Sequence, residues 1–321
     1  MQIADGIADS VAYLSSDAAL ASIAVDPYWP KWHSPWWHML LLHELGEARQ
    51  IPRRTADAMV AGVDRLLHIF PLHPTEAPGA DLQRDIACHC ALGCMAGVLA
   101  SAGIDVNRAL PWIEPWFVRY QMVDGGLSCD ETAYRVTGEC PSSMVGTIAS
   151  LEAMLLGSPA SWSPSRRAFV DRVAQFLVGR LLTQGSATAH NAEERATAAS
   201  WTALAFPRFY FYDVLRGLTA LVRWAELTGH PLPRAAVAAV VDGLEAKAAP
   251  DGALRVERHA HGGRTSIAPT ADRSPSPRMP ATSFPLLEIA SSLGAASPAL
   301  TAQWSAARAG LVRLAAAGRL V

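Results

Sequence analysis

Apolar residues recur along this chain at the three- and four-residue spacing of amphipathic helices, and no stretch shows the alternation of a β-strand. Glycine follows several of these segments, at Gly103, Gly157 and Gly229, where helix C-termini often place it. The pattern therefore predicts an all-helical protein of about twelve helices. Besides an N-terminal pair within 3–24, the predicted helices span 36–48, 55–69, 81–103, 106–121, 142–157, 165–182, 212–229, 232–248, 283–294 and 300–318.

Two kinds of helix alternate in this series. The first kind is apolar on every side and rich in small residues, which is typical of a buried helix: 81–103, 142–157, 212–229 and 283–294. The helices between them are amphipathic, as in SRRAFVDRVAQFLVGRLL, and would cover the buried set. Connections within a pair are short, and those between pairs are long and polar: 123–141, 183–211 and 249–282. This arrangement predicts one closed α/α-toroid domain over 1–321, built from about five or six helical hairpins.

The long connections also repeat a turn signal. QMVDGGL at 121–127 and KAAPDGAL at 247–254 each place Asp-Gly where an outer helix must end and the chain must turn back. Asp124 is therefore interpreted first as a turn residue.

Three stretches resemble the squalene cyclase and prenyltransferase α/α-toroid superfamily. They are QMVDGGL, DGGLSCDETAY with CPSSMVGTIASLEAMLL, and FPRFYFYDVLRGLTALVRW, all within 81–255. They are most similar to bacterial members that combine a DGG turn, a helix opened by two serines and a Tyr-Asp-Val-Leu-Arg helix. The resemblance implies a terpenoid cyclase-like ring of hairpins around a central cavity, and an enzyme of the cyclase, isomerase or lyase type.

The catalytic motifs of that superfamily are missing. The chain has no DxDD acid to protonate an alkene and no DDxxD motif to bind diphosphate through magnesium. Where zinc-dependent protein prenyltransferases carry Asp-x-Cys and a later His, this chain offers Glu139 and Cys140, then Tyr210 or Tyr212. The resemblance therefore does not predict the zinc site of the protein prenyltransferases in this chain. CHCALG is similar to the Cys-His-Gly of lanthionine cyclases, but the rest of that pattern is missing.

Asp85 and His89 lie four residues apart and would share a helix face. A carboxylate and an imidazole so placed can form a general base with its orienting acid, or two ligands of one metal ion. A polar pair between buried helices is the alternative. Cys88, Cys90 and Cys94 are predicted on the same helix, where small cysteines usually serve as core residues.

His38 follows two tryptophans at the start of the predicted helix 36–48. It is a candidate catalytic residue, and Trp36 and Trp37 are candidates for substrate binding. HELGE at 43–47 has Glu where the HExxH zinc pattern needs its second histidine. His38 and His43 are five residues apart and fall on different helix faces, which does not favour a metal pair.

Cys129 and Asp130 lie in the connection 123–141, which leads into a buried helix. In a toroid the N-termini of such helices surround the cavity mouth, and their N–H groups favour anions. Both residues are therefore candidate catalytic residues, and Glu139 and Cys140, closer to the helix, are candidates for substrate binding. A solvated loop is the alternative. The histidines of the other two long connections are expected to face solvent, and the alternative is that these loops cover the cavity and contribute ligands: His190, His259 and His261.

FYFYDVLR places three further candidates at the start of the predicted helix 212–229. An acid among aromatic rings is a setting in which its pKa can rise enough for acid catalysis. Tyr212 and Asp213 are therefore candidate catalytic residues, and Tyr210 is a candidate for substrate binding. Asp213 could instead simply pair with Arg216.

Composition narrows the class of partner. With 17% charged residues and a net charge of -2, the chain offers no electrostatic reason to bind nucleic acid or an anionic membrane. No apolar run reaches the roughly 18 residues of a membrane span, and the start lacks the basic region of a signal peptide. Five cysteines, an odd number, do not indicate a disulfide framework, so a reduced, cytoplasmic location is expected.

We therefore expect an enzyme that acts on a small, partly apolar molecule in a central cavity by acid–base chemistry, without a metal or other cofactor. Its site is expected at the end of the ring that carries the three long connections. If a divalent metal such as zinc or iron took part, Asp85 and His89 would be its ligands. Two alternatives stay open: a binding toroid that lost its chemistry, and a glycan-cleaving toroid that uses two carboxylates. The sequence does not set the oligomeric state.

Overall fold

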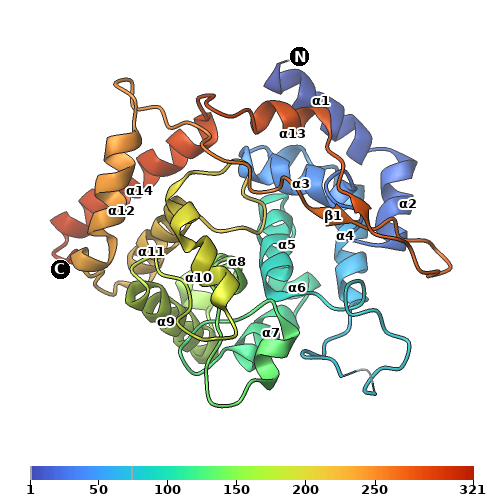
Figure 1. Cartoon of the computed structure of the whole chain (residues 1–321). Helices are drawn as coiled ribbons and strands as arrows, with labels where there is room; N and C mark the ends of the chain where they lie inside the picture. The colour runs from blue at the N-terminus through green and yellow to red at the C-terminus, as the bar shows by residue number, and fades with distance from the viewer. Residues whose placement is uncertain (1, 74) are drawn as a thin grey trace.

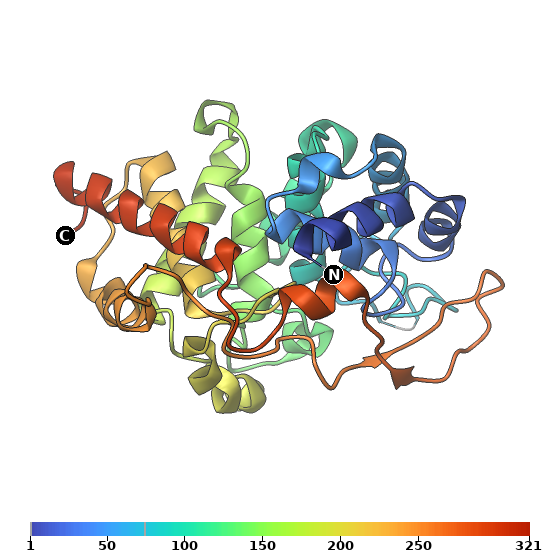
Figure 2. The same cartoon turned by 90° about the horizontal axis from the view of Figure 1, so that it is seen from above.

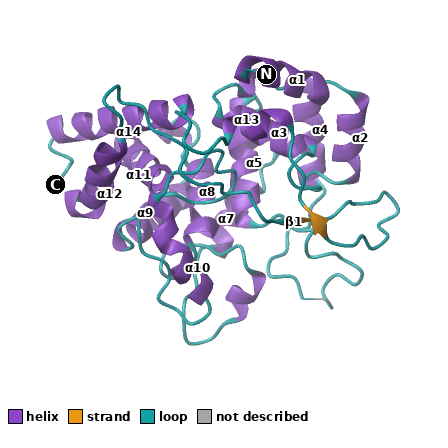
Figure 3. Cartoon of the chain, turned by 45° about the horizontal axis from the view of Figure 1, so that its top comes forward, coloured by secondary structure: helices purple, strands orange, loops and turns teal. Residues whose placement is uncertain are grey.

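The computed structural model describes residues 2–73 and 75–321, and its regular structure is almost entirely helical (Figure 3). The all-helical prediction is confirmed. Two strands of two residues each, β1 (Thr265–Ser266) and β2 (Met279–Pro280), form a small antiparallel ladder. The helices of the described residues are α1 (Ile3–Leu14), α2 (Asp17–Val25), α3 (Pro35–Glu44), α4 (Arg53–Asp64), α5 (His89–Ser101), α6 (Val106–Ala109), α7 (Ile113–Tyr120), α8 (Met144–Met154), α9 (Pro164–Gly179), α10 (Ala192–Thr197), α11 (Val214–Thr228), α12 (Arg234–Lys247), α13 (Pro285–Ala290) and α14 (Pro298–Ala316).

A row of helices runs through the molecule in the order α3, α5, α8, α11 and α14. Helices α1 to α4 lie at one end of this row, and α12 and α14 lie at the other with the C-terminus (Figures 1 and 2). Nearly every residue of α5 and α8 is buried, as their all-round apolar sequences predict. The two helices approach closely because α5 has a glycine, Gly93, facing the backbone of Ala149 on α8.

Amphipathic helices cover this row. Helix α9 packs against α8 and α11, and α12 packs against α11 and α9. Helix α12 buries one stripe of its surface, at the spacing of a single helix face: Ala236, Val237, Val240 and Leu244. The alternation in the sequence therefore corresponds to buried and covering positions in the fold.

One predicted helix begins later than expected. The pattern over 81–103 predicts a continuous helix, but α5 starts only at His89. Before it, the amide of Leu67 donates a hydrogen bond to the carbonyl of Asp85, and Ile86 pairs with Leu67 in an isolated β-bridge. These backbone groups therefore bond to another segment and cannot form helical hydrogen bonds.

Two other predictions need correction. The segment 106–121 forms two helices, α6 and α7, because Pro111 has no N–H and disfavours helical geometry in the residue before it. The inner helix predicted for 283–294 forms only as the short α13, which packs against α1, where Leu286 lies directly against Gly6. Helix α14 was expected to be an outer helix, but it packs along α11, where the sequence predicted the inner helix 283–294.

The turn after α7 forms as the Asp-Gly signal predicts. Gly125 has a φ of 94°, in the left-handed region that glycine adopts freely, and Oδ1 of Asp124 accepts the amide of Gly126 at 3.0 Å. The structural interpretation of Asp124 is confirmed. Among the helices of 2–73 and 75–321, none combines the length and apolar character needed to cross a lipid bilayer.

Candidate active site

The three long connections meet at a cavity of about 470 Å³ beside the N-terminal ends of α8 and α11. Each connection contributes residues to its lining: 123–141, 183–211 and 249–282. Ser143 and Val145, at the start of α8, complete it. The connections therefore gather at one end of the buried helices, as the sequence predicts. Among the predicted site residues, those that line this cavity are Cys129, Asp130 and Tyr212.

Asp130 and His190 form a carboxylate–imidazole pair at this cavity. Nε2 of His190 lies 2.8 Å from Oδ2 of Asp130, across sixty residues of sequence. With Nε2–H donating to the carboxylate, Nδ1 carries the lone pair, and within the described residues Nδ1 has no hydrogen-bond partner. The side chain of His190 is 20% exposed, so a molecule in the cavity can reach it. An imidazole oriented by a carboxylate is the arrangement of a general base.

Further hydrogen bonds hold this pair in place. The two carboxylate oxygens of Glu139 accept the amides of Ala189 and His190, at 2.9 and 3.0 Å, which fixes the backbone that carries the imidazole. Oδ1 of Asp130 accepts the amide and the hydroxyl of Thr132. Glu139, predicted to contact a substrate, thus acts here as a support for His190. Its neighbour Cys140 has its sulfur 3.6 Å from the hydroxyl of a serine, Ser142, and does not line the cavity.

Arg264 supplies an uncommitted positive charge at the cavity. Its guanidinium lies over the ring of Phe211, 4.8 Å from the centroid, and the described part of the chain gives it no ion pair. Arg258, in contrast, donates to the carbonyl of Tyr212 at 2.8 Å and to a second backbone carbonyl. The cavity therefore combines a free cation, aromatic surface and a candidate base.

The local environment shifts the pKa of the groups at this cavity in different directions. Burial by itself would raise the pKa of Asp130, but hydrogen bonds from Thr132 and His190 outweigh it and lower that pKa below its ordinary value. The carboxylate is therefore charged near neutral pH and can stabilise a protonated His190. Burial raises the pKa of Glu194 and raises that of Tyr212 well above its ordinary value, so the tyrosine stays neutral.

The sulfur of Cys129 belongs to a second cluster. It lies with the sulfurs of Cys88 and Cys90, from the first turn of α5, and the three atoms are all within 4.8 Å of one another. The two sulfurs from α5 are 3.4 Å apart, and the amide of Cys90 donates to the sulfur of Cys129 at 3.1 Å. All five cysteines of the chain are free thiols. The sequence-based interpretation of Cys88 and Cys90 as core residues did not anticipate this cluster.

Lys31 lies beside these thiols. Its ammonium donates to the hydroxyl of Tyr210 at 3.0 Å, and its charge interacts with Cys90 and Cys88. Burial lowers the pKa of Lys31 to about 8, so it is still mostly protonated at neutral pH. Hydrogen bonds from Cys129 and Cys90 lower the pKa of Cys88 well below its usual range, and the same kind of contact raises the pKa of Cys90.

The predicted Asp85–His89 pair does not form. Asp85 lies in the turn before α5, and its carboxylate pairs with Arg273 at 2.6 Å. His89 is fully buried among aromatic rings, and its Nδ1–H donates to the carbonyl of Ser128 at 2.6 Å. Burial lowers the pKa of His89 to about 4. Because α5 starts at His89, the two residues share no helix face, and the proposed base or ligand pair is corrected.

The predicted residues of α3 pack in the core instead of lining this cavity. His38 stacks on Phe284 with ring centroids 3.7 Å apart, and Nδ1 lies 3.1 Å from the hydroxyl of Ser10. Burial lowers its pKa to about 3. Trp36 and Trp37 are almost completely buried. These contacts tie α3 to α1 and α13, and they leave the three side chains away from the cavity lining.

Asp213 caps a helix. It is fully buried, and Oδ1 accepts the amide of Arg216 at 2.9 Å and the guanidinium of Arg208 at 3.2 Å. These are the contacts of an N-cap residue with a paired charge. Tyr212 reaches the cavity, but its hydroxyl donates to the carbonyl of Leu182. The predicted role of Asp213 as a cavity acid is therefore replaced by a structural contact.

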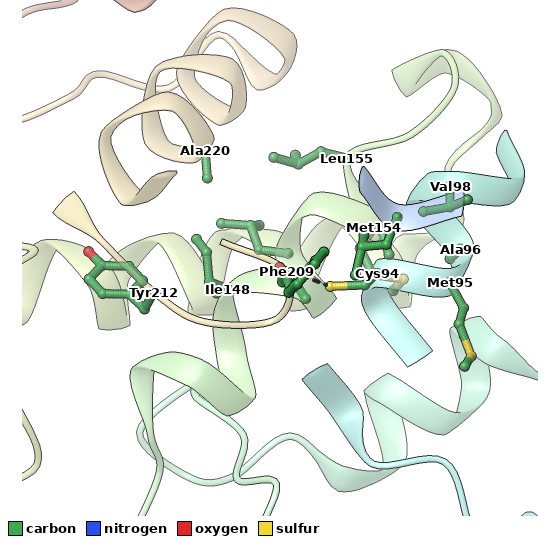
Figure 4. Packing of buried hydrophobic residues seen from close by; sticks show 14 of the residues in the cluster. Cys94, Met95, Ala96, Val98, Ile148, Met154, Leu155, Phe209, Tyr212 and Ala220 are labelled. Carbon is green, nitrogen blue, oxygen red and sulfur yellow. Dashed lines mark hydrogen bonds between the residues drawn. The ribbon is translucent and has the colours of Figure 1, made fainter. Parts of the chain in front are cut away.

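A second cavity, of about 370 Å³, lies between α3, α5, α8, α11 and α14. Cys94 lies on its wall, and Figure 4 shows its side chain pointing towards Phe209, whose carbonyl accepts the thiol at 3.7 Å. Arg216 bonds to both carboxylate oxygens of Glu152, at 2.8 and 2.6 Å, and also to the carbonyl of Phe209. Because these charges are already paired, the contacts fit a structural role better than a catalytic one.

Sequence reasoning missed three residues of these sites: His190, Arg264 and Lys31. His190 was expected to face solvent, and no local pattern marks it, because its partner is sixty residues away. Arg264 and Lys31 lie in connecting segments without a recognisable motif. Only the aromatic residues around Lys31 give a signal in the sequence, in YWPKWHSPWW.

No protein-family model matches the chain, and no curated protein sequence matches it. Among solved structures, two of the type II terpene cyclase MstE from Scytonema are similar to it. The apo structure has 15% sequence identity and a TM-score of 0.27, and the alignment covers 78% of this chain and 80% of that one. The complex with geranylgeranyl dihydroxybenzoate has 13% identity and a TM-score of 0.26, with 78% and 81% covered. TM-scores this low do not establish a shared fold.

Proposed function

We propose that this chain is an enzyme that binds a small molecule in the 470 Å³ cavity and transfers a proton on it, with His190 as the general base. The supporting observation is the 2.8 Å contact between His190 and Asp130, which leaves the other ring nitrogen free at a cavity. Nδ1 takes a proton from a C–H or O–H group of the substrate, and the Asp130 carboxylate stabilises the imidazolium that results. Reprotonation elsewhere gives an isomerase, and loss of a leaving group gives a lyase.

The lining indicates the class of substrate. Arg264 can bind a carboxylate or phosphate group, and the rings of Phe211 and Trp201 can cover an apolar part. A small, partly apolar anion fits both features. The proton transfer as written requires no metal or other cofactor.

We also propose that the helix row closes as an α/α-toroid around the 370 Å³ cavity. The support is that five helices from α3 to α14 line this one cavity, which brings the two ends of the row to the same space. A small-angle scattering curve of the purified chain would test this, since a closed ring and an open superhelix differ in radius of gyration. A curve that fits only an extended superhelix contradicts closure.

The test of function begins with binding. Small carboxylates and phosphates with an apolar portion are screened against the full chain by thermal shift, and each compound that binds is incubated with the chain in D₂O. We expect at least one such compound to exchange a carbon-bound proton for deuterium, detected by ¹H NMR. His190→Gln should retain binding and lose the exchange, whereas Arg264→Gln should weaken binding.

A matched control exists elsewhere on the chain. His230, in the connection between α11 and α12, and Asp171, on α9, form another imidazole–carboxylate pair at 3.4 Å. His230→Gln should change neither binding nor exchange. Binding without exchange in the wild-type chain would support a binding protein without catalysis, and exchange that survives His190→Gln would exclude His190 as the base.

A further inference from the structure

Three cysteine sulfurs from two distant segments converge at the start of α5. Cys88 is the N-cap residue, Cys90 lies in the first turn, and Cys129 arrives from the connection that follows α7. The sulfurs lie within 4.8 Å of one another, and one pair is 3.4 Å apart. Four-coordinate zinc binds thiolates at about 2.3 Å, which places neighbouring sulfurs roughly 3.8 Å apart. The separation of Cys88 and Cys90 is slightly shorter than this value, and the other two separations have 4.8 Å as their upper limit.

The surroundings favour negative charge at the three sulfurs. The amide of Cys90 donates to the sulfur of Cys129 at 3.1 Å, and the N-terminal turn of α5 presents its positive end to the cluster. Lys31 lies beside the thiols, surrounded by the rings of Tyr28, Trp29, Trp32 and Tyr210, each centroid 5.2 to 5.6 Å from its nitrogen. Within 2–73 and 75–321 its ammonium donates to the hydroxyl of Tyr210, and no carboxylate forms an ion pair with it. The cluster therefore has a backbone amide, a helix N-terminus and an ammonium group as neighbours, and all three favour sulfur ligands bound as thiolates.

We propose that Cys88, Cys90 and Cys129 bind one Zn²⁺ ion as thiolates. Three thiolates and one divalent ion carry a net charge of about -1, which the Lys31 ammonium neutralises, so the buried assembly is uncharged as a whole. Binding releases the remaining thiol protons to solvent, with no change of oxidation state.

The three thiolates leave one coordination position of a tetrahedral ion unfilled. Cys88 and Lys31 both line a cavity of about 310 Å³, and Cys129 lines the 470 Å³ cavity. The fourth position is therefore reached by water or by a small ligand from a cavity, which is the coordination of a reactive site and not of a closed structural one.

The proposal is independent of the proposed acid–base function, because His190 is not a member of the thiol cluster. It also differs from the metal ligands considered from the sequence, since Asp85 pairs with Arg273 and His89 donates to a carbonyl. The alternative to zinc binding is a disulfide between Cys88 and Cys90, which would consume two of the three sulfur ligands.

The experiment uses the full chain purified under a non-chelating reductant. Zinc content is measured by elemental analysis, and the metal-depleted chain is titrated with Co²⁺, whose thiolate charge-transfer band in the near ultraviolet reports sulfur ligation. We expect one zinc per chain, and a strong Co²⁺ band that Zn²⁺ removes in competition. Cys129→Ser and Cys90→Ser should each lose the band and weaken zinc binding more than about 100-fold, since even loss of an outer-shell partner costs 10- to 100-fold.

Three variants serve as controls. Cys140→Ser changes a cysteine outside the cluster and should keep the band, as should His190→Gln, which tests the proposed function separately. Lys31→Met should keep the band and weaken zinc affinity by about 10- to 100-fold, as expected for an outer-shell partner.

A second experiment uses only the wild-type chain and therefore does not depend on whether a ligand variant folds. It measures which cysteines are alkylated with and without zinc. Zinc should protect Cys88, Cys90 and Cys129 from iodoacetamide but leave Cys140 reactive, as read by peptide mass spectrometry. Absence of both the band and this protection under reducing conditions overturns the proposal. So does a chain that, without reductant, is isolated with a Cys88–Cys90 disulfide and binds no Zn²⁺ after reduction.

Discussion

Gly93 of α5 and Ala149 of α8 meet backbone to backbone. A Cβ atom added to Gly93 would lie 2.3 Å from the carbonyl carbon of Ala149 and 2.4 Å from its oxygen. Because these are main-chain atoms of a buried helix, they cannot move aside as a flexible side chain could. The contact sets how closely the two central helices approach.

Gly93→Ala is therefore expected to lower the free energy of unfolding by about 3 kcal/mol, at the upper end of overpacking costs. Urea denaturation followed by circular dichroism measures this change. Gly243, within α12, is the matched control, since an added Cβ there meets no atom within 4 Å. Gly243→Ala should raise the free energy of unfolding by about 0.5 to 1 kcal/mol. Equal effects at the two positions would contradict the close approach.

The Arg216–Glu152 pair joins α11 to α8 through two hydrogen bonds, and the arginine is buried. Glu152→Gln leaves that charge without its counter-ion. We expect a loss of about 2 kcal/mol in the free energy of unfolding, below the 3–5 kcal/mol of a fully buried pair because Glu152 keeps some contact with solvent. The exposed pair of Arg53 and Asp57 gives the comparison, and Arg53→Ala should cost less than about 0.5 kcal/mol.

His38 is expected to make stability depend on pH. Burial lowers its pKa in the folded chain to about 3, whereas its ordinary value is 6.5. Below pH 6.5 the unfolded chain therefore binds a proton that the folded chain does not, and stability falls as pH falls towards 3. The slope is up to about 1.4 kcal/mol per pH unit. His38→Gln should remove this part of the slope between pH 5.5 and 4, measured by urea denaturation at each pH. An NMR titration of folded His38 with a midpoint near its ordinary value would contradict the expectation.

Glu139 is expected to order the segment that carries His190. Its two oxygens accept the amides of Ala189 and His190, and Glu139→Gln replaces one acceptor by an N–H₂ group that faces a donor. Both amides should then exchange with deuterium several-fold faster, measured by NMR or mass spectrometry. Glu131→Gln in the same connection, which accepts neither amide, should leave their exchange unchanged. The same exchange rates in both variants would show that Glu139 does not hold this segment.

The sequence predicted most of the helices and whether each is buried or covers the buried row. It could do so because apolar faces and glycines at helix C-termini are local features of the sequence. Helices α8, α9, α11 and α12 form within a few residues of the predicted ranges. The exception at the C-terminal end has a physical cause. The segment 283–294 is apolar enough for an inner helix, but it is short, and it finds its partner in α1, which the local pattern cannot indicate.

The candidate site was predicted in part. Cys129 and Asp130 were singled out by their place in a connection before a buried helix, and both reach a cavity. Their partners could not be predicted, since His190 and Cys88 approach from segments separated from them by about 60 and 40 residues. Asp213 and His38 show the opposite error. A charged or polar residue among aromatic rings can be a site residue or a satisfied core residue, and only the hydrogen bonds found in the fold distinguish the two.

The contact of Gly93 with the backbone of α8 fixes the middle of α5 against that helix. The first turn of α5 carries Cys90, its third turn carries Gly97 on the wall of the 370 Å³ cavity, and Gly93 lies between them. The thiols and the wall of that cavity therefore share one helix, with Cys90 and Gly97 about 10 Å apart along its axis at 1.5 Å of rise per residue, so neither can be rebuilt without regard to the other.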